Sequence, residues 1–419
     1  MKKLRGSEAV GVVTGVSQHN FSKEIRSDMD LPKKVIVNDL TLREGRQIEG
    51  VVLSLDELIR IANQLEEIGV PMVQLSLLGE GDYEFLKEFK KRGIKIKVEV
   101  FSAGHQTPPF TVKTMNDQID RVLETGVGMP DLPFALSDDL LKSVAYGAGQ
   151  RDMSVDDLKK EEIEFAIEAV QHAKSQGAKI NVNLQDFMRC DIGYMQKFCK
   201  ELDKAGVNVI TLDDIAGPSL PSVYKYCVRK VKEVVPDVPI GIHVHNDFAL
   251  ALPGVLGALE GGAEVLDCGV NAYGERAGHC ELAQLVVILE FLYGYDTGIK
   301  LERLTETAKL ISDIMRQPLP KWSPITGDNT FSHLADWHWQ HQEFPWAVAS
   351  LAPEVVGNSS RAIFGHQVGP YGLRVKAKEL GINIPDEKLP RLATALTEKM
   401  RWSKRPITDI EFRMMVEKL

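Results

Sequence analysis

Two histidines two residues apart, His243 and His245, are the first candidates for chemistry in this sequence. They follow an apolar run, residues 238–242, that is typical of a β-strand. Side chains at positions i and i+2 of a strand point to the same face, so both imidazoles can aim at one point. Imidazole is a common ligand of first-row divalent cations, but a histidine at a strand end can also simply satisfy backbone groups. The pair alone leaves both interpretations open.

A second polar stretch follows the apolar residues 35–37 and contains Asp39, Thr41, Arg43, Glu44 and Gln47. Glu44 offers the carboxylate that a metal site with two histidines still needs. Arg43 carries a fixed, planar set of donors that suits a carbonyl or enolate oxygen gaining negative charge, and Gln47 is a candidate for binding the substrate. The alternative for Arg43 and Glu44 is a surface ion pair, which would contribute little.

Further polar groups stand at the ends of other apolar runs. His279 closes the segment 271–279, and it could reach the same metal if the last strand lies beside the first in a closed barrel. Asp213 and Asp214 could accept hydrogen bonds from metal-bound imidazoles, or they could cap a helix that begins at Pro221. The candidate metal ligands are therefore Glu44, His243, His245 and His279.

The elements that must position these residues alternate regularly between short apolar runs and amphipathic stretches. This alternation indicates βα units around a parallel sheet. The expected strands are residues 35–37, 72–77, 95–101, 127–132, 180–184, 209–212, 240–245 and 265–269. The expected helices are residues 55–68, 83–91, 116–124, 155–176, 192–205, 221–234, 249–261 and 282–292, with a long connection at 133–154.

Eight such pairs predict an α/β fold, a (β/α)₈ TIM barrel, whose functional sites lie at the carboxyl ends of the strands. An open doubly wound sheet is the alternative. It would normally show a G-x-G-x-x-G turn after the first strand, and this sequence has none there.

Composition and length set the limits of the interpretation. The 419 residues predict an N-terminal arm (1–32) that is loosely ordered or docks on a partner, the catalytic barrel (33–298) and small helical C-terminal subdomains (299–419). The net charge of −9 argues against a nucleic-acid partner. Five cysteines without a C-x-x-C pair, and no apolar run long enough for a signal peptide or a membrane helix, predict a cytoplasmic protein with no membrane partner.

Three motifs in this order resemble the DRE-TIM metallolyases: Asp39-Leu-Thr-Leu-Arg-Glu-Gly-Arg-Gln, His243-Val-His-Asn-Asp and Gly274-Glu-Arg-Ala-Gly. The segment 324–372 resembles the linker subdomains of the Claisen-condensing branch, the isopropylmalate, homocitrate and citramalate synthases. The resemblance implies a divalent cation (Mg, Mn, Zn or Co) held by His243, His245 and an acidic residue, for which Glu44 is the candidate. It also implies that Arg43 supports the oxygen of the 2-oxo acid or enolate.

The implied reaction is the condensation of an acyl-CoA, with acetyl-CoA as the expected donor, and a 2-oxo acid. A histidine of the linker subdomain, matched by His333, is implied as part of the base, often presented to a neighbouring subunit. With the aromatic cluster Trp337, Trp339 and Trp346 as an anchor, this predicts a homodimer. The alternative interpretation of the histidine- and tryptophan-rich segment 328–372 is a packed dimer interface without a catalytic role.

The sequence also departs from the family pattern. Gln185 stands where a glutamate is usual, Ile215 where a threonine is usual, and His279 where many members have asparagine. The identity of the oxo acid is therefore open. Two other function classes also stay open: a metal-dependent aldolase or lyase that cleaves a carbon–carbon bond, and a catalytically inactive barrel that serves as a binding partner.

Overall fold

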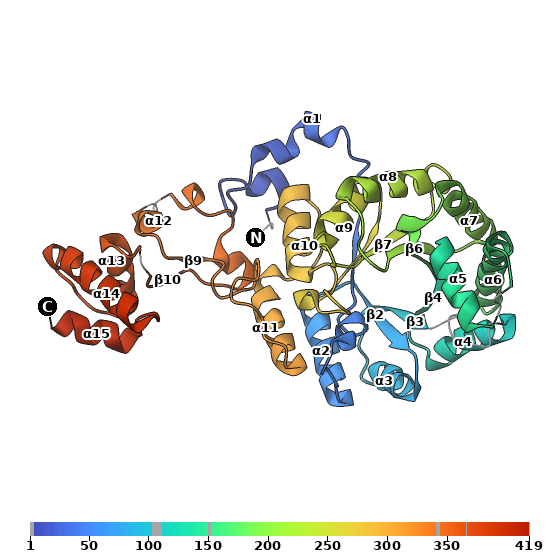
Figure 1. Ribbon diagram of the computed structural model, residues 1–419, viewed down its shortest axis with the longest axis horizontal. Helices are drawn as coiled ribbons and strands as arrows, with labels where there is room; N and C mark the ends of the chain where they lie inside the picture. Colours follow the sequence, from blue (N-terminus) through green and yellow to red (C-terminus); the bar gives the residue numbers. More distant parts are fainter. Residues whose placement is uncertain (1–3, 103–110, 150–151, 341–343, 366, 419) are drawn as a thin grey trace. The chain divides into compact units, whose positions relative to one another are not determined.

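The computed structural model describes residues 4–102, 111–149, 152–340, 344–365 and 367–418 (Figure 1). These residues form two compact units. The barrel unit comprises residues 19–300 and 307–318, and the appended unit comprises residues 4–18, 301–306 and 319–418. Within the described residues, none of the helices is both long and apolar enough to cross a membrane.

The barrel unit contains a closed parallel sheet with the strand order β1 to β8, so the predicted (β/α)₈ barrel is confirmed. The strands are β1 (Ile36–Asp39), β2 (Met72–Leu77), β3 (Lys97–Ser102), β4 (Met129–Ala135), β5 (Asn181–Gln185), β6 (Val209–Asp214), β7 (Ile240–Val244) and β8 (Val265–Cys268). The barrel closes between β8 and β1, where Asn38 pairs with Asp267.

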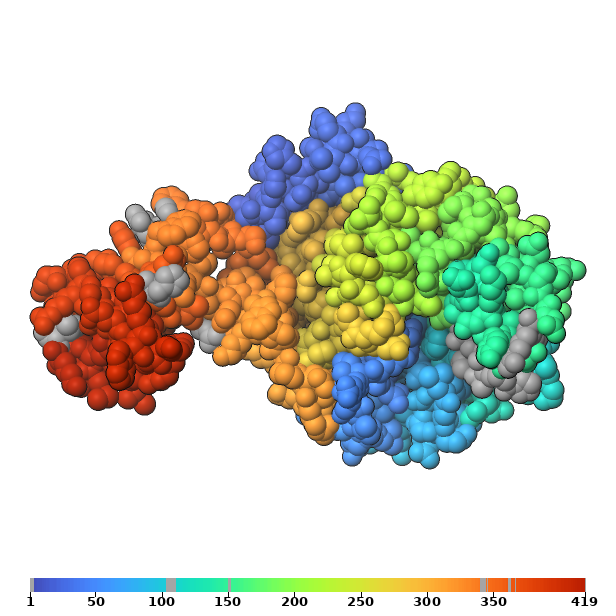
Figure 2. Space-filling model, viewed as in Figure 1, coloured from blue at the N-terminus to red at the C-terminus, as the bar shows by residue number. Residues whose placement is uncertain are grey.

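Helices surround these strands in the order of the chain (Figure 1). They are α2 (Leu55–Ile68), α3 (Glu80–Lys91), α4 (Val112–Thr125), α5 (Asp138–Gly147), α6 (Val155–Ser175), α7 (Ile192–Ala205), α8 (Pro221–Lys232), α9 (Ala251–Glu260) and α10 (Leu282–Ile288). In the space-filling view, successive segments of the barrel unit follow one another around its surface from blue through green to yellow (Figure 2). Helix α2 begins with a capping box, in which the Ser54 side chain accepts from the backbone of Glu57 and the Glu57 side chain accepts from that of Ser54.

The predicted connection 133–154 is wrong in two respects. Strand β4 continues to Ala135 despite its two prolines, because Pro130 pairs beside Val100 and Pro133 beside Asn183 in the parallel ladders. Helix α5 then begins directly after its cap Ser137, whose hydroxyl accepts a hydrogen bond from the backbone of Leu140 at 3.2 Å. The connection is therefore a short helix laid against β4 and α6 and not an extended loop.

The middle of the barrel is polar, although such interiors are usually filled by branched aliphatic side chains. Asn38 donates from its amide nitrogen to Glu99 at 3.0 Å and to Asp267 at 2.9 Å. Gln74 donates to Asp131 at 2.8 Å. Burial, and then the charge of Asp267, raise the pKa of Glu99 to about 8, so this carboxyl holds a proton near neutral pH. We call Asn38, Gln74, Glu99, Asp131 and Asp267 the interior polar layer.

The appended unit combines both ends of the chain. Residues 4–18 were predicted to belong to an arm that is loosely ordered or docks on a partner. They are packed within this unit: Gly15 donates a backbone hydrogen bond to Ser350 at 3.0 Å, and Thr14 is fully buried. The reason is that this segment supplies backbone partners for residues 350–352. How the chain divides into independently folding parts stays a prediction.

The rest of the appended unit is mostly helical, as predicted. Its helices α13 (Pro370–Glu379), α14 (Leu389–Ser403) and α15 (Asp409–Glu417) enclose an apolar core that contains Phe364, Leu373, Leu389, Leu392, Leu396, Ile407 and Phe412. Helix α11 (Leu304–Met315) follows a short 3₁₀ turn, Leu301–Arg303, and residues 307–315 of it belong to the barrel unit.

Candidate metal centre and active site

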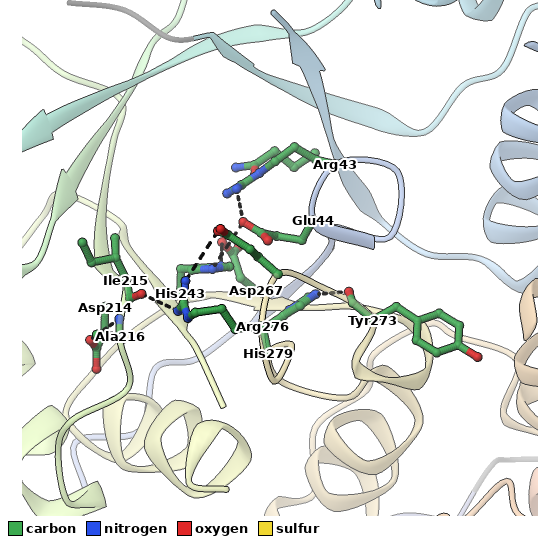
Figure 3. A network of polar contacts seen from close by, with 12 residues as sticks. Arg43, Glu44, Asp214, Ile215, Ala216, His243, Asp267, Tyr273, Arg276 and His279 are labelled. Atoms are coloured by element: carbon green, nitrogen blue, oxygen red, sulfur yellow. Dashed lines mark hydrogen bonds and ion pairs between the residues drawn. The ribbon is translucent and has the colours of Figure 1, made fainter. Parts of the chain in front are cut away.

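Three of the four predicted ligands lie together at the carboxyl ends of the strands. Glu44 opens a 3₁₀ turn just after β1, His243 belongs to β7, and His245 directly follows that strand. One ligand atom from each lies within 4.8 Å of the others, and His243 Nε2 is 4.0 Å from Glu44 Oε1. All three side chains are buried. The convergence expected from the H-x-H spacing is therefore present. Figure 3 shows two of the three residues, Glu44 and His243.

The polar atoms of this cluster support a metal site. Glu44 Oε2, His243 Nε2 and His245 Nδ1 are buried and have no hydrogen-bond partner among the described residues. Buried polar atoms are almost always paired, so three such atoms on the residues of one cluster indicate a missing partner. One carboxylate and two imidazoles suit a first-row divalent cation. The residues present therefore fit the cation that the sequence predicted.

His279 lies beside this cluster without joining it. Its ring stacks on that of His243 with centroids 5.6 Å apart, and its Nε2 is 3.0 Å from the carbonyl oxygen of Tyr273 (Figure 3). Because a carbonyl only accepts, Nε2 carries the proton, and the buried Nδ1 is the atom left for a ligand. A role of His279 in metal binding stays a prediction.

Arg43 is fixed next to the cluster by contacts on several sides. Its Nε donates to Gln74 at 2.6 Å, its NH1 donates to Glu44, and its guanidinium lies 4.5 Å from the ring centroid of Phe101. Although burial alone would raise it, the positive charge of Arg43, with smaller contributions from the histidines, lowers the pKa of Glu44 to about 2. The remaining terminal nitrogen, NH2, is buried and unpaired among the described residues. Arg43 thus keeps one donor for an oxygen of a bound molecule.

The carboxylates expected to support the histidines are distributed differently from the prediction. Asp214 accepts from the backbone of Ala216 and Gly217 and from the Tyr224 hydroxyl, so it fixes the turn after β6 and the start of α8. The histidine partner is Asp267 on β8, whose Oδ2 lies 3.3 Å from His243 Nδ1 (Figure 3). The sequence does carry a signal for Asp267, because it is a charged residue in the middle of a buried strand.

A cavity of about 530 Å³ opens beside the cluster. Its wall includes the predicted residues Arg43, Glu44, Gln47 and His245. It also includes Gln185 and Ile215, two of the three positions where the sequence departs from the family pattern. Asp213 lines it as well, and burial raises the pKa of this carboxyl to about 6.

His333, the predicted part of the base, belongs to the appended unit. It lies in the short strand β9 (Ser332–His333), its Nδ1 is 3.1 Å from His338 Nδ1, and its carbonyl accepts from the indole of Trp339. Burial, and then the neighbouring His338, lower the pKa of His333. Together with Trp339 and Trp346 the two histidines line a separate cavity of about 330 Å³. Two other histidines of this segment, at positions 341 and 366, lie outside the described residues.

Comparisons with known proteins give a consistent result. A family model described as HMGL-like matches residues 34–311. A probable 2-isopropylmalate synthase of Methanosarcina acetivorans is 31% identical over 386 residues, which cover 90% of this chain and 70% of that protein. The (R)-citramalate synthase of Methanocaldococcus jannaschii is 31% identical over 372 residues, covering 87% and 70%. Among solved structures, the hydroxymethylglutaryl-CoA lyase of Pseudomonas aeruginosa superposes with a TM-score of 0.57 at 17% identity, over 70% of this chain and 96% of that one.

Proposed function

Because this chain belongs to the HMGL-like family, we propose that it is a metal-dependent acyltransferase that condenses an acyl-CoA with a 2-oxo acid. Acetyl-CoA is the proposed acyl donor, and the products are a 2-hydroxy dicarboxylic or tricarboxylic acid and free CoA. The observation that carries the proposal is the buried convergence of Glu44, His243 and His245 beside Arg43. The synthases named above support the condensing direction, because their similarity covers about nine tenths of this chain.

The proposed reaction joins the two substrates and then hydrolyses the thioester. A base takes an α-proton from the acyl-CoA, the resulting carbanion forms a carbon–carbon bond with the oxo carbon of the second substrate, and the oxo oxygen gains a proton. Water then cleaves the thioester and releases the CoA thiol. When bound, a divalent cation supplies a Lewis acid for the carbonyl oxygen. The unpaired nitrogen of Arg43 is available to the same oxygen as negative charge grows on it.

The proposed roles of Gln47, His333 and His279 rest on where each residue lies in the structure. Gln47 lines the cavity with Arg43, which suits an amide that orients a polar end of the oxo acid. His333 is proposed as part of the base, since burial favours its neutral form, the form that can accept a proton. His279 is proposed as an additional metal ligand through its Nδ1.

We further propose a cytoplasmic homodimer in which His333 completes the site of the neighbouring subunit. The exposed indole of Trp337, in the short helix α12 (Asp336–Gln340), supports an interface there, because large exposed aromatic side chains are enriched at such surfaces.

The second candidate is carbon–carbon bond cleavage by the same barrel. The observation that favours it is the superposition on hydroxymethylglutaryl-CoA lyases, although at identities that establish the fold alone.

One experiment separates the two candidates. Thiol release is measured from a panel of acyl-CoAs with and without 2-oxo acids, using protein loaded with Mn²⁺ or Zn²⁺. Condensation requires thiol release that depends on both substrates and stops after chelation of the metal. Cleavage of a hydroxyacyl-CoA or hydroxy acid without added oxo acid would instead support the lyase.

A further inference from the structure

One part of the wall of the active-site cavity is apolar. Phe101 at the end of β3, Leu140 and Val144 on α5, and Ile215 after β6 all line it. This wall, which we call the α5 wall, contains no metal ligand. Resting on the proposed function, we infer that it selects a 2-oxo acid with an uncharged, branched alkyl side chain, and that Leu140 and Val144 determine this specificity.

The position of α5 is fixed by hydrogen bonds and by packing. The Ser137 hydroxyl caps the helix through the backbone of Leu140 and donates to Asp186, which follows β5. Leu140 and Val144 are one helical turn apart and therefore lie on one face of α5. Both pack against the buried cluster of Ala135, Leu141, Ala145 and Leu158. The two side chains are thus held in place by the ends of β4 and β5 and by the packing of α5.

Among the described residues, the cavity wall has no cationic group left for a second carboxylate on the oxo acid, since the unpaired nitrogen of Arg43 is assigned to the oxo oxygen. Arg43 and Arg276 are the only cationic side chains among the described residues of the wall. Arg43 already faces Glu44. Arg276 donates to both oxygens of Asp247, at 2.9 and 3.1 Å, and to the carbonyl of Ile215 at 2.6 Å.

The other charged lining residues, Asp213 and Glu275, are acidic. A dicarboxylic oxo acid would therefore bring its second carboxylate against apolar and acidic groups, where an unpaired charge is strongly disfavoured. A neutral alkyl group on the same carbon would replace water at Leu140 and Val144, which is favourable. Ser143 and Gly147, on the same helix, also line the cavity, and their small side chains leave room for branching.

The test measures kcat/KM for 2-oxo acids that differ only in the side chain, with acetyl-CoA as donor. The panel is pyruvate, 2-oxobutanoate, 2-oxoisovalerate, 2-oxo-4-methylpentanoate and 2-oxoglutarate. We expect a branched substrate to exceed pyruvate by about tenfold or more, since one methylene in an apolar pocket changes the rate about 10–200-fold. We expect 2-oxoglutarate to be the poorest. Preference for pyruvate or for 2-oxoglutarate would overturn the inference.

Variants locate the effect on α5. Leu140→Ala should lower kcat/KM for the branched acids about tenfold or more and leave that for pyruvate within about twofold. Leu140→Arg should raise the rate with 2-oxoglutarate relative to every neutral acid. Lys142→Ala, on the exposed side of the same helix, is the matched control and should change none of these ratios. An equal loss for all substrates in Leu140→Ala would contradict a role in specificity.

Direct binding separates this inference from the proposed reaction. Calorimetry with Mn²⁺-loaded protein measures the affinity of each oxo acid without turnover, and thermal unfolding checks that each variant is folded. The branched acids should bind most tightly in the wild type, and Val144→Ala should reduce this advantage. If no acid releases thiol but the preference in binding is present, the condensation is wrong and the specificity stands. Equal binding of all the acids would refute the specificity.

Discussion

Replacing Asp267 by asparagine is the sharpest test of how the barrel holds the candidate metal ligands. Asp267 Oδ2 lies 3.3 Å from His243 Nδ1, and Asp267 Oδ1 accepts from the Asn38 amide at 2.9 Å. A carboxylate accepts on both sides, so it keeps the proton of His243 on Nδ1 and leaves Nε2 free to bind the metal. Asparagine has only one accepting side. If its oxygen serves Asn38, its amide nitrogen opposes Nδ1 and favours the tautomer with the proton on Nε2.

The expected loss of metal affinity follows from this change of tautomer. Losing the carboxylate partner of a metal-bound histidine typically weakens metal affinity about 10–100-fold, or roughly 1.4–2.7 kcal/mol. The affinity for Mn²⁺ or Zn²⁺ is measured by competition with a chromogenic chelator, which needs no substrate. His243→Ala sets the value for a missing ligand, and Asp267→Asn should fall between it and the wild type.

Asp131→Asn is the matched control, because Asp131 is an equally buried carboxylate of the interior polar layer that accepts from Gln74 instead. It should retain the metal affinity of the wild type more closely than Asp267→Asn does. Wild-type affinity in Asp267→Asn, with unaltered unfolding, would show that His243 is oriented by something else and would refute the reasoning.

Arg43→Ala should lower kcat about 10²–10³-fold with a smaller effect on KM, because the unpaired donor of Arg43 meets negative charge that grows during the reaction. Arg92→Ala, which removes only an ion pair on the surface of α3, is the control. A change in KM alone would argue against a role of Arg43 in the transition state. Mixing inactive His333→Ala with inactive Arg43→Ala subunits should restore partial activity if the sites are shared, whereas no recovery after verified subunit exchange would place His333 outside the neighbour's site. Burial raises the pKa of Asp39 to about 7 against the hydrogen bonds from Thr41, so the folded protein keeps a proton that the unfolded chain releases above about pH 4. The resulting stability is complete below about pH 4 and is lost as the pH rises through 7; Asp39→Asn should flatten that decline in urea unfolding curves, and an unchanged slope would assign it to other groups.

The barrel could be predicted from the sequence because its signal is repeated. Each βα unit shows an apolar run followed by an amphipathic stretch, so one ambiguous strand does not change the count of eight. The convergence of Glu44 with His243 and His245 followed from the topology, since β1 and β7 both end at the same face of a closed parallel barrel.

The errors arose where a residue's role depends on a distant partner. Pro130 and Pro133 made β4 seem to end early, and the helix after it was missed, because the pairing with β3 and β5 overrides the local signal. Because they end a strand, Asp213 and Asp214 were predicted either to support the histidines or to cap the helix that begins at Pro221. Asp214 instead binds Tyr224, ten residues further on, and the contact between Asp267 and His243 depends on the register of the neighbouring strands β7 and β8.

The interior polar layer has a consequence for how this sequence can change. Asn38 serves Glu99 and Asp267 at once, and Gln74 joins Asp131 to Arg43, so each amide belongs to two partners on different strands. Removing one member leaves a buried polar group unpaired, which costs more than the hydrogen bond itself contributes. A single substitution in this layer is therefore selected against, even where replacing both hydrogen-bond partners together would be tolerated. Among homologous barrels, the residues at these positions of β1, β2, β3, β4 and β8 should therefore covary. A different barrel interior should evolve by replacement of several of these residues together.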